Sequence, residues 1–114
     1  MSSSIHQMKL SKVPFEKIAN GSKVIESRLF DDKRKLINVG DRIEFTQSDD
    51  SSKKVNMKVK ALYRYATFPE LFSDFLPTYF GGESKELLLI EIEQLYSKEE
   101  QIKFGVLGIK IEKE

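Results

Sequence analysis

A chain of 114 residues and 13.2 kDa has the length of one domain with a single packed core. It has no cysteine and one histidine, His6, which excludes disulfide scaffolds, thiolate chemistry and metal sites built from cysteine or clustered histidines. The formal net charge of +1 hides an uneven distribution. Residues 1–64 carry 14 Lys and Arg against 8 Asp and Glu, a net of +6, while residues 65–114 carry 5 against 10, a net of −5. This split favours either a positive face for a polyanion or mutual neutralisation where the two halves pack.

The chain carries no feature of a membrane or secreted protein. The stretch after Met1 is polar, and the longest aliphatic run, 87–90, is far shorter than a membrane span. No Gly-rich phosphate loop, nucleophile elbow or metal-binding helix motif is present. We therefore expect a soluble, cytoplasmic protein without membrane partner, metal or cofactor. The sequence leaves its oligomeric state open.

The N-terminal third predicts a strand, a short helix and a second strand. Residues 5–10 alternate as a strand that places His6 among apolar neighbours, where a lone histidine is more often a hydrogen-bonded core or rim residue than a ligand. Pro14 suits a first helical turn, apolar residues follow three and four apart, and Asn20-Gly21 is a plausible stop. Residues 23–30 are then expected to be extended.

The middle of the chain predicts a hairpin. A turn at 39–41 leads into a strand at 42–47, residues 48–52 form a loop, and residues 53–65 alternate strictly as a second strand, with only Leu62 out of pattern. The polar side of this second strand carries a basic stripe, which we define as Lys54, Lys58, Lys60 and Arg64. Such a stripe suits contacts with nucleic-acid phosphates, or it is a solvated face whose lysines block edge pairing.

The C-terminal half predicts short helices and a closing strand. Thr67-x-x-Glu70 has the form of a capping box before an aromatic helix, and Ser97-x-x-Glu100 offers a second capping box. Residues 85–96 fit either a helix or a strand, and their length favours a helix. Residues 107–111 alternate as a last strand. The expected fold is α+β, a mostly antiparallel sheet or small barrel of about five strands with short helices between them.

The most informative charged residues lie between Gly21 and Arg28. Lys23 begins the predicted strand, and Glu26 and Arg28 share one of its faces, so three charged groups come within reach at one end of the sheet. One interpretation is a polar pocket with donors from Arg28, an acceptor or base in Glu26 and an amine in Lys23. The other is a structural ion pair between Glu26 and Arg28, because charges are costly to bury unless paired.

These residues also carry a family resemblance that covers nearly the whole chain. The motifs are His6-x-Met8-Lys9-Leu10, Pro14-Phe15, Gly21-x-Lys23-x-x-Glu26-x-Arg28, Asp31-x-Lys33-Arg34, Gly40-Asp41-x-Ile43-x-Phe45 and Gly105-Val106-x-Gly108-Ile109. In this combination the sequence resembles the ASCH (activating-signal-cointegrator homology) domain, here a single domain over residues 1–114. The resemblance implies a PUA-like β-barrel with flanking helices and a polar cleft beside the barrel. It also implies RNA or nucleotide binding.

Carried over by position, the resemblance makes Lys23, Glu26 and Arg28 the candidate cleft residues, with Arg34 and Asp41 in support. Asp41 also fits a purely structural role, since aspartate after glycine is typical of a tight turn.

Some small ASCH relatives resemble amidohydrolases that remove the acetyl group from N4-acetylcytidine with a lysine, a threonine three residues on and a later glutamate. Here Lys23 matches the lysine, Glu26 stands at the threonine position, and Glu83 or Glu86 are candidates for the later glutamate.

Two functions from different classes follow. In the first, Lys23, Glu26 and Arg28 bind a base or nucleotide while the basic stripe contacts RNA phosphates, which predicts salt-sensitive binding. In the second, a small amidohydrolase acts on a modified nucleoside, with Lys23 and Glu26 catalytic and Arg28 holding the developing anion, which predicts little salt dependence. The absence of a hydroxyl at position 26 favours binding. A protein-interaction domain is a third alternative, indicated only by the acidic half.

Overall fold

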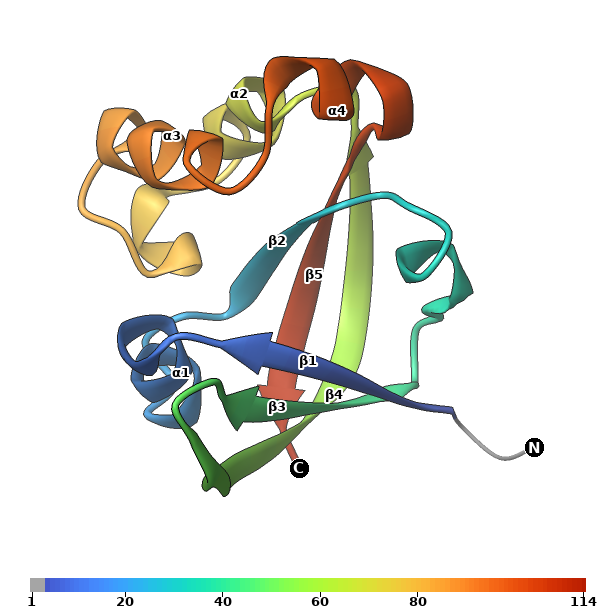
Figure 1. The fold of residues 1–114 in the computed structure, drawn as a ribbon, viewed down its shortest axis with the longest axis vertical. Coiled ribbons are helices and arrows are strands. Elements are labelled where there is room, and N and C mark those ends of the chain that lie inside the picture. Colours follow the sequence, from blue (N-terminus) through green and yellow to red (C-terminus); the bar gives the residue numbers. More distant parts are fainter. Residues whose placement is uncertain (1–3) are drawn as a thin grey trace.

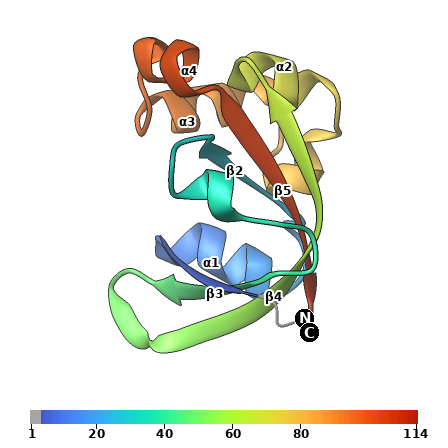
Figure 2. The same cartoon turned by 90° about the vertical axis from the view of Figure 1, so that its right-hand side faces the viewer.

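The computed structural model describes residues 4–114, which form one curled five-stranded sheet with one helix inside its curl and a layer of helices at one end (Figure 1). The strands are β1 (Ile5–Leu10), β2 (Ile25–Leu29), β3 (Arg42–Gln47), β4 (Asp50–Tyr65) and β5 (Val106–Lys113), in the order β1-β3-β4-β5-β2. β1 runs parallel to β3, and the other three pairings are antiparallel. The sheet is thus a half-barrel, open between its edge strands β1 and β2 (Figure 2). The predicted α+β class with five mostly antiparallel strands is confirmed.

The helices are short and gather in two places. α1 (Lys12–Ala19) lies within the curl of the sheet, whereas α2 (Phe68–Ser73), α3 (Lys85–Glu93) and α4 (Lys98–Phe104) form a layer at one end (Figure 2). 3₁₀ turns cover Arg34–Leu36 and Pro77–Phe80. The choice of a helix for the ambiguous segment 85–96 is confirmed up to Glu93. Within residues 4–114, no helix is long and apolar enough to cross a membrane.

Two hydrophobic clusters occupy the two faces of the sheet. The first, inside the half-barrel, joins Phe15 and Ile18 of α1 to residues of β1, β3, β4 and β5. The second packs the aromatic residues of α2 and Phe80 against Ile25 and Leu29 of β2. Burial of this apolar surface is the main favourable contribution to folding. β2 therefore has an apolar face toward the helical layer, which leaves its other face for Glu26 and Arg28, as the alternation predicted.

β4 departs from the expected strict alternation. Its pairing with β5 shifts register between Val59 and Ala61, so Lys60 lies at a β-bulge. An extra residue reverses the facing of every residue after it. Leu62 accordingly packs in the first cluster with Val59, while Tyr63 and Tyr65 pack in the second. The out-of-pattern Leu62 was the sequence signature of this bulge. β4 also begins at Asp50, so the predicted loop at 48–52 is shorter than expected.

The two predicted capping boxes have different outcomes. Ser97 and Glu100 form a complete one at the start of α4, with both reciprocal hydrogen bonds. Thr67 is the N-cap residue of α2, but its side chain makes no capping hydrogen bond, so that prediction was wrong. The reason is tertiary: the first free N–H of α2, on Phe68, donates to Oε1 of the buried Gln101 in α4.

Candidate functional site

The candidate site lies where the half-barrel fails to close. Glu26 and Arg28 pair in register with Ile109 and Leu107, so they face the interior of the curl at the free edge of β2. Among residues 4–114, no backbone ladder joins this edge to β1. The Nη2 group of Arg28 instead donates to the carbonyl oxygen of Lys9 in β1 at 3.1 Å. A charged side chain therefore links the two edge strands where backbone pairing stops.

Glu26 is the centre of an ion-pair network. Its carboxylate lies 2.9 Å from Lys23 Nζ and 2.9 Å from Arg28 Nε, and it accepts a third hydrogen bond from the Ser27 N–H. The residue is only 3% exposed. Burial disfavours its charged form, but Lys23 and Arg28 outweigh this effect and lower the pKa of Glu26 to about 2. The carboxylate is therefore ionised at neutral pH and has its main acceptor positions occupied.

Arg28 is held in the charged form by the same network. Burial disfavours the guanidinium charge, but Glu26 and the Tyr96 hydroxyl outweigh it and raise the pKa of Arg28 above its ordinary value. With Nε on Glu26 and Nη2 on the Lys9 carbonyl, the guanidinium plane has a fixed orientation. Such a fixed, charged donor is suited to recognising a polar group of a ligand.

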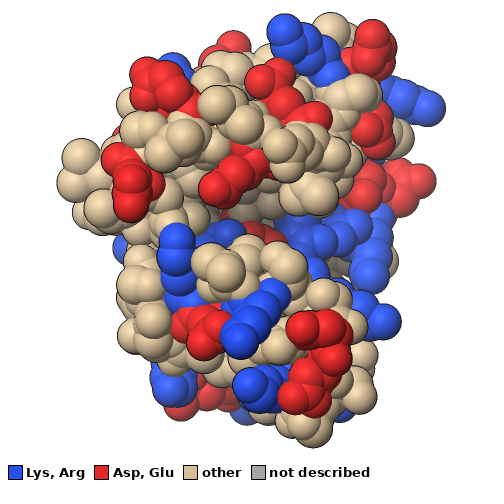
Figure 3. All heavy atoms as spheres, turned by 60° about the vertical axis from the view of Figure 1, so that its left-hand side comes forward, with Lys and Arg blue, Asp and Glu red and all other residues tan. Residues whose placement is uncertain are grey.

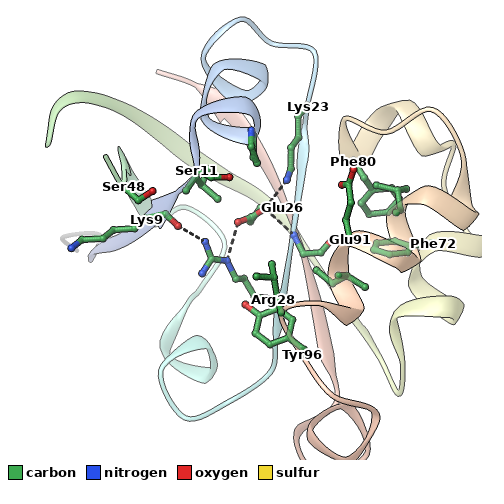
Figure 4. Close-up of a pocket in the computed structure, with 16 residues that line it drawn as sticks. Lys9, Ser11, Lys23, Glu26, Arg28, Ser48, Phe72, Phe80, Glu91 and Tyr96 are labelled. Atoms are coloured by element: carbon green, nitrogen blue, oxygen red, sulfur yellow. Dashed lines mark hydrogen bonds and ion pairs between the residues drawn. The ribbon is translucent and has the colours of Figure 1, made fainter. Parts of the chain in front are cut away.

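A cleft of about 370 Å³ opens above this network, which we call the main cleft. Its polar side is formed by Lys23, Glu26 and Arg28, together with Lys9, Ser11 and Ser48 (Figure 4). The opposite wall comes from the helical layer and is mostly apolar: Phe72, Phe80, Leu88, Ile92, Leu95 and Tyr96. Its size lies within the usual range of small-molecule sites. In the space-filling view, Lys and Arg side chains gather along one side of the hollow, with mainly uncharged and acidic side chains on the other (Figure 3).

The structure does not bring all the predicted site residues together. Lys23, Glu26 and Arg28 line the main cleft, whereas Arg34 lines an adjoining pocket. Asp41 lines neither and has a structural setting, accepting hydrogen bonds from His6 Nε2 at 2.8 Å and from the Asn38 N–H in the turn before β3.

The hydrogen bonds of Asp41 also favour its ionised form. Burial disfavours its charged form, but hydrogen bonds from His6 and two backbone N–H groups outweigh this and lower the pKa of Asp41. The contact with Asp41 agrees with the expectation that His6 is a hydrogen-bonded core or rim residue. These two residues stabilise the turn that starts β3.

The basic stripe is exposed but divided. Lys54 pairs with Glu44 and Lys60 with Glu112, and Lys60 lies at the bulge. Beyond the bulge Arg64 faces the other side of the strand, where its guanidinium lies 4.0 Å from the centroid of the Phe30 ring. β4 is the central strand, two strands from either edge of the main cleft. Phosphate contact by the stripe stays a prediction.

Sequence reasoning missed the side of the cleft that α3 provides. Glu91 lines it and Tyr96 lies beside Arg28, while neither Glu83 nor Glu86 lines it. The helix chosen for 85–96 could have indicated Glu91, Ile92, Leu95 and Tyr96 as one face three to five residues apart. The sequence did not indicate which surface this helix face would lie against. Within residues 4–114, no group of three or more metal-ligating side chains occurs.

The fold and the cleft motifs define a known family. Residues 8–114 match the family model of the ASCH domain, so the chain belongs to the ASCH domain family. Its structure also matches the PUA-like architecture expected of that family. No sequence relative was found among proteins with curated descriptions.

Several solved structures share this fold. The hypothetical protein PH0355 is 33% identical with a TM-score of 0.85, covering 96% of this chain and 99% of that one. Protein PF0455 from Pyrococcus furiosus is 32% identical, with a TM-score of 0.75 and 96% of each chain covered. The ASCH protein from Zymomonas mobilis shares the fold at 12% identity, with a TM-score of 0.70 over 96% of this chain and 67% of that one.

Proposed function

We propose that this ASCH domain binds RNA or a nucleotide, with one nucleoside unit held in the main cleft. One observation carries the proposal: a buried Lys23–Glu26–Arg28 network faces an apolar wall that includes Tyr96 across a cleft of about 370 Å³. A nucleobase is flat and apolar on its faces and carries donors and acceptors on its edges. Proteins bind such bases by stacking on aromatic side chains and by hydrogen bonds to the base edges.

The state of Glu26 favours binding over acid–base catalysis. A general base works best when its pKa lies near the operating pH. The pKa of Glu26 is about 2, and its carboxylate already accepts hydrogen bonds from its neighbours. In this proposal Glu26 orients Lys23 and Arg28, and those two cations present donors to the ligand.

The proposal is tested by calorimetric titration with cytidine, the other three ribonucleosides and a single-stranded 12-nucleotide RNA. We expect saturable binding that Tyr96→Ala weakens, while Tyr79→Ala, a change at a half-exposed tyrosine outside the main cleft, does not. RNA binding should weaken with salt because phosphate contacts release counterions. The absence of saturable binding to any of these ligands, with both variants folded, would refute the proposal.

The same titrations include the basic stripe. If the stripe contacts phosphates, replacing Lys54, Lys58 and Lys60 by Gln lowers the salt dependence of 12-nucleotide RNA binding and leaves nucleoside binding unchanged. Equal loss for nucleosides and RNA would instead indicate a general effect of charge or stability.

A second candidate function is hydrolysis of an acylated nucleoside such as N4-acetylcytidine. The observation in its favour is that Lys23 and a second carboxylate, Glu91, line the main cleft together. Water would add to the acetyl carbonyl, and the products would be acetate and cytidine. The test is cytidine release by the wild type beside Lys23→Ala, with folding checked by circular dichroism. Release that is lost in the variant supports hydrolysis, and no release by folded wild type rejects this substrate.

A further inference from the structure

A second, strongly basic pocket adjoins the main cleft. This pocket, which we call the side pocket, has a volume of about 360 Å³, and four cationic residues line it: Lys9, Arg28, Lys33 and Arg34. Gln7 and Thr46 add neutral polar groups, and no carboxylate from the described part of the chain lines it. A concave surface with charges of one sign concentrates the potential and attracts ions of the opposite sign.

The positive charge of the side pocket is only partly neutralised from outside. Glu26 pairs with Arg28, and Asp31 pairs with Arg34 through one contact of 3.2 Å. Among the described residues, Lys9 and Lys33 take part in no ion pair. Two of the four charges are therefore left for an anion.

Arg34 has hydrogen-bonding capacity that the protein does not use. Its Nη1 donates to Asp31, but its buried Nε has no partner among the described residues. The Arg34 backbone N–H also donates to Asp31, at the start of the 3₁₀ turn, so the position of the residue is fixed. A buried guanidinium N–H without a partner is costly, and an anion bound alongside Arg34 would let a small rotation of the guanidinium satisfy it.

The two sites are continuous because Lys9 and Arg28 line both. A ligand with an apolar ring system in the main cleft would therefore have a negatively charged substituent within reach of the side pocket. The geometry points to the side pocket as a phosphate subsite, held by Arg34 and Lys33 with Lys9 and Arg28. The domain then takes a nucleoside phosphate, as a free nucleotide or as one unit of an RNA strand, in preference to a nucleoside. This inference rests on the proposed function for the nucleoside part of the ligand only.

The experiment follows backbone amide resonances of the full chain during titration with four probes: inorganic phosphate, cytidine, 5′-CMP and the dinucleotide CpC. We expect phosphate and 5′-CMP to shift the amides of Gln7, Lys33 and Thr46. We also expect 5′-CMP to bind about tenfold more tightly than cytidine at low salt, the gain typical of a hydrogen bond to a charged group. If CpC shows the gain and 5′-CMP does not, the subsite takes a phosphodiester.

Arg34→Gln tests the assignment, with Lys35→Gln as the matched control. Lys35 lies next in sequence, is exposed, contacts Asp32 and lines neither site. Arg34→Gln should abolish the tighter binding of 5′-CMP relative to cytidine and leave the affinity for cytidine unchanged. Lys35→Gln should leave both affinities as in the wild type. Lys33→Gln, at an exposed position, should reduce the affinity difference between 5′-CMP and cytidine in part. It replaces Arg34→Gln as the test variant if Arg34→Gln does not fold.

The outcomes separate the two proposals. If neither phosphate nor any phosphorylated probe shifts the side-pocket amides, or if Arg34→Gln and Lys35→Gln behave alike, the phosphate subsite is refuted even where cytidine binds. If cytidine leaves the amides of Ser27 and Tyr96 unmoved, nucleoside binding fails. Phosphate shifts that Arg34→Gln abolishes would then still support an anion site.

Discussion

The guanidinium of Arg28 on β2 donates to the backbone carbonyl of Lys9 on β1, 3.1 Å away, across the gap between the two edge strands of the curled sheet. The same guanidinium donates to Glu26 and lines both the main cleft and the side pocket. One side chain thus connects the two edge strands, the buried carboxylate and both candidate binding surfaces. This connection makes the shape of the site depend on the geometry of an arginine and not only on its charge.

Replacing Arg28 by lysine should therefore be harmful although the charge is kept. Lysine can pair with Glu26, but it lacks the planar fork that also reaches the Lys9 carbonyl. We expect a loss of about 1.5–3 kcal/mol in the free energy of unfolding, the usual contribution of one hydrogen bond to a charged group. We also expect faster amide hydrogen exchange in β1. Arg64→Lys, at an exposed position on β4, is the control, and equal exchange rates in the two variants would contradict this account.

Glu26→Gln should destabilise the protein strongly. The change leaves Lys23 and Arg28, each with a side chain 12% exposed, without their carboxylate. Removing one member of a buried ion pair typically costs about 3–5 kcal/mol. Glu44→Gln removes the partner of the half-exposed Lys54 and should cost less than about 1 kcal/mol. Urea denaturation of both variants measures the difference. Similar losses of stability would show that the Lys23–Glu26–Arg28 ion pairs contribute no more to stability than an exposed pair.

Stability should also fall in acid because of Glu26. The pKa of Glu26 is about 2 in the folded protein against an ordinary value of 4.5, so the unfolded chain takes up a proton first as the pH falls. The stabilising contribution is therefore complete above about pH 4.5 and is lost as the pH falls toward 2. Asp41, whose pKa is also lowered, adds to this loss. Urea midpoints between pH 2.5 and 7 should fall more steeply in the wild type than in Glu26→Gln. If the urea midpoints of the two proteins fell equally with pH, the lowered pKa of Glu26 would not be the cause of the acid destabilisation.

The two N-caps should respond differently to alanine. Ser97→Ala removes a complete capping box and should cost about 1 kcal/mol. Thr67→Ala should lower the free energy of unfolding by less than about 0.5 kcal/mol. The reason is that Thr67 makes no capping hydrogen bond, while Gln101 accepts from the first N–H of α2. Thermal or urea unfolding of the pair measures this. A larger loss for Thr67→Ala would mean that its hydroxyl caps α2 in solution.

The sequence indicated the strands well and the assembly of the site less well. Alternation located every strand, and the shared face of Glu26 and Arg28 follows from a period of two. The bulge at Lys60 was visible only as the misfit of Leu62, because periodicity does not show where an extra residue enters. Failure of the Thr67 cap was not predictable at all, since its replacement comes from Gln101, 34 residues further on.

The candidate site shows the same division. The contacts of Lys23, Glu26 and Arg28 are local, within six residues, and the motif predicted their association. The helical wall with Glu91 and Tyr96 reaches the main cleft only through the packing of α3 and its following turn against β2. Single-sequence reasoning predicts local groupings from period and spacing, while the surfaces that face them depend on tertiary packing.

The measurement that tests the central claim most directly is a set of intermolecular nuclear Overhauser effects between ¹³C-labelled protein and unlabelled 5′-CMP. The account predicts contacts from the base protons to the side chains of Ile92, Leu95 and Tyr96, on the helical wall of the main cleft. Ribose contacts should lie toward Lys9, which the main cleft and the side pocket share. Contacts confined to β4, or none at saturating nucleotide, would contradict the account.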